Sequence, residues 1–440
     1  MLALFIATIV AIIGKVLPIG AIAIIAVMLV ALTGVTNDSP KDAIADALSS
    51  YSSPLIWLIG IAVMISRGLI KTGLGRRIAY YFISIFGKKT IGVAYSLTAA
   101  ELMIAPITPS NTARGGGIIH PIMLSIAQSF HSTPEEGTQN KIGRYLAMVN
   151  YHANPITSGM FITATAPNPL VVDLVNKATG SEIQLSWTTW AVAMFIPGML
   201  CLLLMPLVIY LIYPPDVKVT PDAKQFAKDS LSEMGQVSTQ EKIMLGVFAL
   251  MLILWANIPA LIFGEQLSVD ATTTAFIGLT ALILTGVLTW DDVLKEKSAW
   301  DTIVWFGALI MMASYLNKLG LVGWFSSNIE SMIGVIGVGW IGAVVILTLV
   351  YLYIHYFFAS TTAHITALFA AFYAVGLSLG APPMLYALIL AAAGNIMMTL
   401  THYATGTAPV IFNSGYVTLG EWWIIGAIMS VVNLVVWIGA

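Results

Sequence analysis

The sequence predicts an all-α polytopic membrane protein, and three observations support this fold class. Of the 440 residues, 58% are hydrophobic and only 9% are charged, whereas a soluble globular protein has about 25% charged residues. The mean hydropathy is +0.90. Several apolar runs approach the roughly 20 residues that an α-helix needs to cross a bilayer, so we expect the lipid bilayer to surround most of the chain.

Charge and cysteine content exclude other classes of protein. The net charge of −2 gives no basic field that would bind phosphates, so no nucleic-acid partner is expected. The single cysteine, Cys201, rules out an intramolecular disulfide and a cysteine metal cluster, and neither a metal nor a cofactor is expected. The chain opens on apolar residues without a basic leader or a transit peptide, which favours the inner (plasma) membrane of a bacterium.

The first half of the sequence predicts several membrane spans and one hairpin. Residues 1 to 34 contain two N-terminal apolar runs, the second from 16 to 33. The segment from 38 to 213 is expected to form a first structural repeat, with these elements in order: a short surface helix at 41 to 50, a span at 54 to 70, a hairpin at 90 to 130, a broken helix at 151 to 177 and a returning span at 186 to 213.

Basic residues indicate the orientation of this half. The densest basic cluster follows the span at 54 to 70 and consists of Arg67, Lys71, Arg76, Arg77, Lys88 and Lys89. Positively charged loops stay in the cytoplasm. The hairpin at 90 to 130 is therefore expected to enter and leave the membrane from the cytoplasmic side.

The second half repeats this order of elements. Residues 214 to 240 are hydrophilic and open with two prolines, which predicts a cytoplasmic linker between the halves. A connecting span at 241 to 262 follows. The segment from 265 to 440 is expected to form a second repeat, with spans at 269 to 288 and 300 to 317, a hairpin at 340 to 375, a broken helix at 382 to 417 and a last span at 421 to 440.

A polar, glycine-rich stretch from Thr108 to Gly117 organises the first repeat. The apolar runs on either side of it, residues 90 to 107 and 118 to 130, are short and interrupted by proline. Unpaired backbone groups are not tolerated in hydrocarbon, so a turn at membrane depth must line a cavity inside the protein. We interpret the stretch as the tip of a re-entrant hairpin that holds a solute.

The polar turns recur in the second half. Residues 110 to 114 match 360 to 364, and residues 164 to 167 match 406 to 409. Small residues in apolar runs also serve helix packing, but four polar turns matched in pairs are difficult to explain by packing alone. Five predicted crossings separate Lys71 from its counterpart Lys318, so the repeats are expected to be inverted. Paired broken segments in inverted halves indicate a transporter with its substrate site near the midplane.

Hairpin tips and helix breaks expose helix N-termini, which attract anions. Arg114 lies at the start of a helix, where a cation opposes the dipole, so it needs an anion: either Glu101 or the substrate itself. His364 occupies the matching place in the second half, and an ionisable group inside a membrane segment indicates function. The predicted substrate-binding residues are Ser110, Asn111, Thr112, Arg114, Thr165, Ala166, Pro167, Ser360, Thr361, Thr362, His364, Thr407, Ala408 and Pro409.

These motifs resemble the divalent anion/sodium symporter family over nearly the whole chain. The run from Thr108 to Gly117 is most similar to the exchanger branch of that family, which includes bacterial citrate/succinate antiporters and plastid 2-oxoglutarate/malate translocators. The resemblance implies a homodimer in which a transport domain moves against a scaffold as an elevator. It also implies exchange of C4 and C5 dicarboxylates such as succinate, malate, fumarate and 2-oxoglutarate.

The sequence departs from the sodium-coupled members at two kinds of position. Thr361 replaces the second Asn of the motif, and cationic side chains, Arg114 and His364, stand beside the places where sodium would bind. A fixed positive charge repels a neighbouring sodium ion strongly at low dielectric. We therefore expect sodium-independent exchange, in which an empty carrier with unpaired buried cations reorients poorly. The alternative is a sodium-coupled dicarboxylate symporter.

Two other classes are weighed against a carrier. An intramembrane metalloenzyme would use His355, His364 and His402, but their spacing matches no metal motif, so no enzymatic activity is expected. A channel would need a continuous pore, whereas paired hairpins favour alternating access.

Overall fold

The computed structural model describes residues 1–440 except 15, 322, 325–327, 329–338 and 440. In this part of the chain the secondary structure is helical apart from one antiparallel bridge between Lys89 and Val219. The predicted all-α membrane fold is confirmed. Seven helical segments of the described chain are long and apolar enough to cross a membrane: Pro54–Thr72, Thr90–Ile107, Trp187–Ile212, Lys297–Lys318, Trp340–Phe357, Thr361–Ser378 and Leu419–Gly439.

The N-terminal runs form α1 (Leu2–Ile13) and α2 (Ile19–Thr33). Helix α2 is shorter than the run at 16 to 33, because Pro18 lies before it in an extended conformation and the residue before a proline avoids the helical region. The predicted surface helix at 41 to 50 appears as α3 (Pro40–Leu48) followed by a 3-10 turn (Ser49–Ser52).

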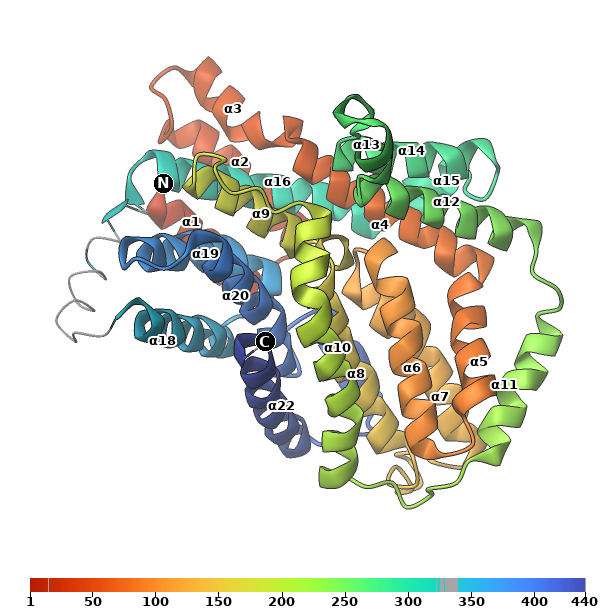
Figure 1. Cartoon of the computed structure of the whole chain (residues 1–440). Coiled ribbons are helices and arrows are strands. Elements are labelled where there is room, and N and C mark those ends of the chain that lie inside the picture. Colours follow the sequence, from red (N-terminus) through yellow and green to blue (C-terminus); the bar gives the residue numbers. More distant parts are fainter. Residues whose placement is uncertain (15, 322, 325–327, 329–338, 440) are drawn as a thin grey trace.

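The segments predicted as the first hairpin, 90 to 130, and as the first broken helix, 151 to 177, are each made of several helical elements. The hairpin consists of α6 (Thr90–Ile104), a 3-10 turn (Ala105–Ile107), a π-helix (Thr112–Ile119) and α7 (His120–Ser129). The broken helix consists of α8 (Gly143–Met160), a 3-10 turn (Ile162–Ala164) and α9 (Pro167–Ala178). With α10 (Trp187–Ile212), the helices α6, α7 and α8 run alongside one another in the centre of Figure 1.

The linker between the halves has more structure than a simple connection. Residues 221 to 233 form α11 (Pro221–Glu233), which packs on α5 (Leu74–Phe86). Ahead of α11, the extended residues 216 to 220 pair with both loops that flank the first hairpin. Thr220 N donates to Lys88 O at 2.9 Å on one side, and Val217 N donates to Lys141 O at 3.0 Å on the other.

The second half contains the segments predicted as the second hairpin, 340 to 375, and the second broken helix, 382 to 417. Helix α12 (Thr239–Trp255) begins with a capping box, in which Ser238 and Glu241 bond each other's backbone N–H groups. The remaining elements are α13 (Ile258–Phe263), a 3-10 turn (Glu265–Leu267), α14 (Ala271–Leu284), α15 (Trp290–Lys295), α16 (Lys297–Lys318), α18 (Trp340–Tyr353), a 3-10 turn (Ile354–Phe357), α19 (Thr361–Ser378), α20 (Pro383–Ile396), a 3-10 turn (Met397–Thr399), α21 (Thr407–Phe412) and α22 (Leu419–Gly439).

The two halves interlock through their helices. Helix α4 (Pro54–Thr72) packs on α14 and α16, while α19 of the second hairpin packs on α9 of the first broken helix. In Figure 1, α18, α19, α20 and α22 form one group of helices beside α8 and α10. An inverted relation between the halves and an elevator motion stay predictions.

Candidate functional site

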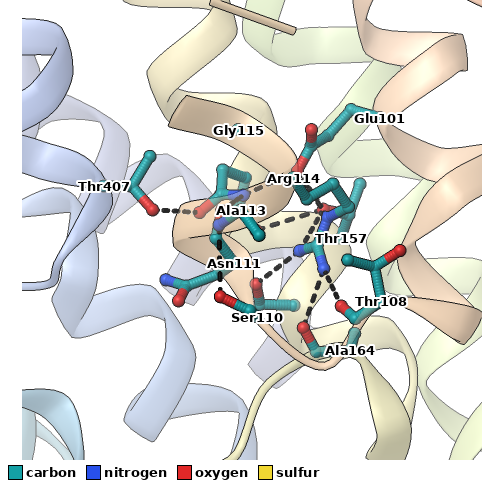
Figure 2. Close-up of polar contacts among 12 residues, drawn as sticks. Glu101, Thr108, Ser110, Asn111, Ala113, Arg114, Gly115, Thr157, Ala164 and Thr407 are labelled. Carbon is teal, nitrogen blue, oxygen red and sulfur yellow. Dashed lines mark hydrogen bonds and ion pairs between the residues drawn. The ribbon is translucent and has the colours of Figure 1, made fainter. Parts of the chain in front are cut away.

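The tip of the first hairpin touches both helix breaks, and Figure 2 shows its contact with Ala164 of the first break. Thr163 of the first break donates its hydroxyl hydrogen to Pro106 O, and Ala164 O accepts a hydrogen bond from Arg114. On the side of the second break, Asn111 Nδ2 donates to Thr405 Oγ1 at 2.9 Å. Polar turns that lie up to 294 residues apart in sequence therefore meet at one place inside the protein.

Arg114 is fully buried and donates all of its hydrogens to protein oxygens. Its Nε lies 2.7 Å from Glu101 Oε1, and the accessibility of both side chains is 1% or less. The two terminal nitrogens donate to the following four acceptors: Thr108 O at 2.7 Å, Ala164 O at 2.8 Å, Ser158 Oγ at 2.9 Å and Thr157 Oγ1 at 3.4 Å. A guanidinium has five N–H groups, so this geometry leaves none of them for a further ligand.

Glu101 is the anion that the sequence required near Arg114. Its Oε1 accepts from Arg114 and from Asn154 Nδ2 at 2.6 Å, and Thr157 Oγ1 lies 3.4 Å away. Its Oε2 is buried and has no hydrogen-bond partner among the described residues. The ion pair makes the net charge of this cluster zero. We expected an empty carrier to hold unpaired buried cations, and this expectation is wrong for Arg114, which is paired with Glu101. A direct role of Arg114 as a substrate ligand stays a prediction.

Asn154 was not singled out from the sequence, yet it joins three elements. This residue of α8 is fully buried and donates from Nδ2 to Glu101 Oε1 and to Asn111 O at 3.0 Å. Its Oδ1 accepts from Thr407 Oγ1 at 3.3 Å. A lone Asn in a helix gives no sequence signal of such contacts, because the partners come from distant segments.

The tip of the first hairpin packs closely against the break in the second broken helix. A β-carbon on Gly406 would lie 2.5 Å from Thr112 Oγ1, and one on Gly115 would lie 2.8 Å from Asn154 Nδ2. Only glycine leaves room at these two positions, which explains why small residues flank the polar ones here. Ser110, which is half-buried, accepts a hydrogen bond from Ala113 N at 3.1 Å, near the start of the π-helix.

The tip of the second hairpin contacts the same break from another side. Ser360 caps α19 by accepting from Ala363 N at 3.3 Å, and Thr361 Oγ1 donates to Ala404 O at 3.3 Å. His364 is buried in the first turn of α19, where its Nδ1 lies 3.2 Å from Nδ1 of His355. Residues 404 to 407 thus contact both hairpins.

The other predicted residues lie at helix starts near these contacts. Thr165 is buried, and its carbonyl accepts from Asn168 N at 3.2 Å at the start of α9. The buried side chain of Thr362 lies in the first turn of α19. Four more predicted residues belong to the junctions that begin α9 and α21, and no side-chain bond links them to the opposite half in the described chain: Ala166, Pro167, Ala408 and Pro409.

The histidines weighed as metal ligands do not gather. His355 and His364 are adjacent, but His402 lies 3.4 Å from Trp423 Nε1. Within the described residues no three His, Cys, Asp or Glu side chains are placed to hold a metal ion.

With this geometry in view, comparison with known proteins decides the family. The family model described as the sodium:sulfate symporter transmembrane region matches residues 1–440. The chain belongs to this family. As a member of it, the chain is a membrane-spanning transporter, and the resemblance seen in its hairpin motifs is confirmed.

Individual relatives agree with the family. YflS of Bacillus subtilis, provisionally named a malate transporter, is 50% identical over 436 residues, which cover 99% of this chain and 88% of the relative. Dicarboxylate transporter 1, chloroplastic, of Spinacia oleracea is 44% identical over 439 residues, which cover 100% of this chain and 75% of the relative. The crystal structure of the Alcanivorax borkumensis YdaH transporter has the same fold, with a TM-score of 0.56 at 13% identity, over 89% of this chain and 84% of that one.

Proposed function

We propose that this protein exchanges C4 and C5 dicarboxylates across the membrane without sodium. Relatives at 50% and 44% identity carry names that specify malate or dicarboxylate transport. The convergence of hydroxyl groups and helix starts at the two hairpin tips suits carboxylates, since neutral donors and helix N-termini bind anions that must also be released. Succinate, malate, fumarate and 2-oxoglutarate fit this class.

The environment of Arg114 supports sodium independence. In transporters with broken helices, unwound backbone carbonyls coordinate the coupling cation. Here two such carbonyls, Thr108 O and Ala164 O, accept hydrogen bonds from one guanidinium nitrogen at 2.7 Å and 2.8 Å. The guanidinium therefore occupies the oxygens that a sodium ion would use, and it contributes the positive charge that offsets Glu101.

The substrate would then be held by groups other than the Arg114 charge. The hydroxyl groups of Ser110 and Thr112 donate no hydrogen bond within the described residues and are available for this, whereas those of Thr361 and Thr407 would first have to leave Ala404 O and Asn154 Oδ1. The N-terminal ends of α19 and α21 add partial positive charge. Exchange as the transport mode, the elevator motion and the homodimer are what the resemblance to the exchanger branch implies. Bacterial relatives such as YflS support the inner membrane of a bacterium as the location.

The alternative is sodium-coupled dicarboxylate symport, and one observation favours it. Glu101 Oε2 is buried and unpartnered among the described residues, and a carboxylate oxygen is a suitable cation ligand. This oxygen belongs to the same cluster as Arg114, so ion dependence separates the two functions directly.

Uptake of labelled succinate into proteoliposomes tests the proposal. The vesicles contain either dicarboxylate or none, and the outside medium contains either sodium or potassium. We expect uptake that requires internal dicarboxylate and proceeds equally with both cations. Uptake into empty vesicles that follows a sodium gradient would support the symporter instead.

A further inference from the structure

Two buried histidines form a contact that the proposed substrate site does not explain. His355 lies in the turn after α18, and His364 lies at the start of α19; both are 0% exposed. Their Nδ1 atoms are 3.2 Å apart, and His355 Nε2 lies 3.1 Å from Ala404 O. The His364 ring packs edge-on against Tyr351, at 4.6 Å between centroids, so its orientation is fixed by its neighbours.

These contacts determine where the protons of a neutral pair reside. A carbonyl oxygen only accepts, so His355 Nε2 carries a hydrogen, and Nδ1 of a neutral His355 is an acceptor. The Nδ1–Nδ1 contact then requires His364 to donate from its own Nδ1. In this state His364 Nε2 has no hydrogen, and this atom is buried without a partner among the described residues.

The neutral histidine pair can bind one more proton and keep the Nδ1–Nδ1 contact, but it cannot bind two. Whether the extra charge is assigned to His355 or to His364, one hydrogen lies between the Nδ1 atoms and another is on His364 Nε2. A second additional proton would place two N–H groups against each other across 3.2 Å, with no acceptor between them and two like charges in a buried site. The pair therefore holds a charge of zero or one.

Helices α18 and α19, which flank the pair, and helix α20 offer no acidic counter-ion. The sequences of α18, α19 and α20 contain no Asp, Glu, Lys or Arg. Asp173 and Lys177 on α9 pair with each other at 2.7 Å. The other ionisable side chains on the elements that pack against α19, on α19 itself and in the second break are Tyr351, Tyr353, Tyr356, Tyr373, Tyr386, His402, Tyr403, Lys297, Asp301, Tyr315 and Lys318.

We propose that the His355–His364 pair binds one proton, on His364 Nε2, together with the substrate anion. His355 is the positioning residue that limits the pair to this one charge. The proton enters from water as the dicarboxylate binds and returns to water when it leaves, so the charged pair always has an anion beside it. The inference rests on the proposed function for the identity of that anion.

Calorimetry on the purified full-length protein tests the proposal. Fumarate is the probe, because both of its carboxyl groups are ionised between about pH 7 and about pH 8.5. Titration in two buffers with different ionisation enthalpies gives the number of protons bound with each fumarate. We expect about one, with a Kd that weakens about tenfold for each pH unit where the empty pair is neutral.

Two variants assign the effect to the pair. His364→Gln should abolish the proton uptake and the pH dependence of Kd. His355→Leu removes the acceptor for His364, while Ala404 O keeps the hydrogen bond from Thr361 Oγ1, so the pH at which Kd begins to weaken should fall by about one unit, because the charged form loses a partner. The matched control is His131→Asn, which removes an exposed histidine and should leave the wild-type profile unchanged.

The wild-type measurement alone decides the outcome if either variant fails to fold. Fumarate binding with no proton uptake and a constant Kd across this pH range would overturn the inference and leave the proposed function standing. A protein that binds no fumarate at any pH would overturn both.

Discussion

A guanidinium buried among membrane helices needs a counter-charge and a full set of acceptors, because neither lipid nor packed side chains replace water. Arg114 has both, with Glu101 as the counter-charge and oxygens of the tip, of α8 and of the first break as the remaining acceptors. The side chain therefore holds three segments in register. Its removal affects geometry and charge together.

We expect Arg114→Ala to abolish dicarboxylate exchange and to lower the free energy of unfolding by about 3–5 kcal/mol, because it leaves the Glu101 carboxylate buried and unpaired. Arg114→Ala combined with Glu101→Gln removes that uncompensated charge and should recover much of the stability but not the exchange. The measurements are thermal unfolding in detergent, in potassium buffer, and exchange in proteoliposomes.

Lys295→Ala serves as the control, since the ion pair of Lys295 with Asp291 is exposed and should have no measurable effect. Normal exchange by Arg114→Ala would show that the hairpin tip keeps its working geometry without the ion pair. Equal stability of the single and double variants would show that Glu101 is not ionised in the folded protein.

Among single residues, the sequence indicated those that belong to a recognisable local motif, but it gave no indication of those whose contacts come only from distant segments. Arg114 and Glu101 were recognised because an isolated cation in a membrane segment demands an anion. Asn154 and the bond from His355 to Ala404 were not, because each depends on a partner from a distant segment. Burial and hydrogen bonding of such residues become apparent only when the chain is folded.

Among the elements, the first hairpin shows most clearly how backbone shape serves the site. Its second arm begins as a π-helix from Thr112 to Ile119, a conformation that is rare and frequently occurs at functional sites. Three successive glycines lie in this segment, and their surroundings differ. Gly115 faces Asn154 and Thr407, whereas a β-carbon on Gly117 would meet no atom within 4 Å.

We expect Gly115→Ala to lower the free energy of unfolding by about 1–3 kcal/mol through overpacking and to reduce exchange strongly. The new methyl group would lie 2.8 Å from Asn154 Nδ2 and 3.1 Å from Thr407 Cγ2, which pushes the tip away from the second break. Gly117→Ala is the matched control in the same segment and should exchange at the wild-type rate. Equal behaviour of the two variants would argue against contact between tip and break as a requirement for transport.

The sequence predicts an order of elements because apolar runs and polar turns repeat with clear boundaries. The linker shows where this approach ends. Its composition predicted only a hydrophilic connection, yet residues 216 to 220 pair with the loops before α6 and before α8. Backbone pairing of this kind leaves no mark on composition, and it fastens both ends of the first hairpin to the segment that joins the halves.

In the whole molecule, the polar turns of the two halves contact each other at one place. The second break contacts both hairpin tips through residues 404 to 407, and Asn395 of α20 donates to Asn168 of α9 at 2.9 Å. Replacing the Arg114 cation at the tip of the first hairpin should therefore also affect the second half. We expect that this one substitution can change the ion dependence of transport.

We expect Arg114→Ala to gain a response to sodium that the wild type lacks. Without the guanidinium, Glu101 Oε1, Thr108 O, Ala164 O and Ser158 Oγ form an oxygen cage with a net negative charge, and oxygens are the ligands that a hard cation requires. A bound cation stabilises the folded state by mass action, by about 2.7 kcal/mol at 100 times its Kd. The unfolding temperature of the variant should thus be higher in sodium than in potassium at equal ionic strength.

Arg114→Ala combined with Glu101→Gln keeps the cage but not its charge and should respond weakly or not at all. If the single variant unfolds at the same temperature in both salts, the guanidinium does not occupy a sodium-competent site. The proposed sodium independence would then have to come from the second hairpin, where Thr361 stands in place of Asn.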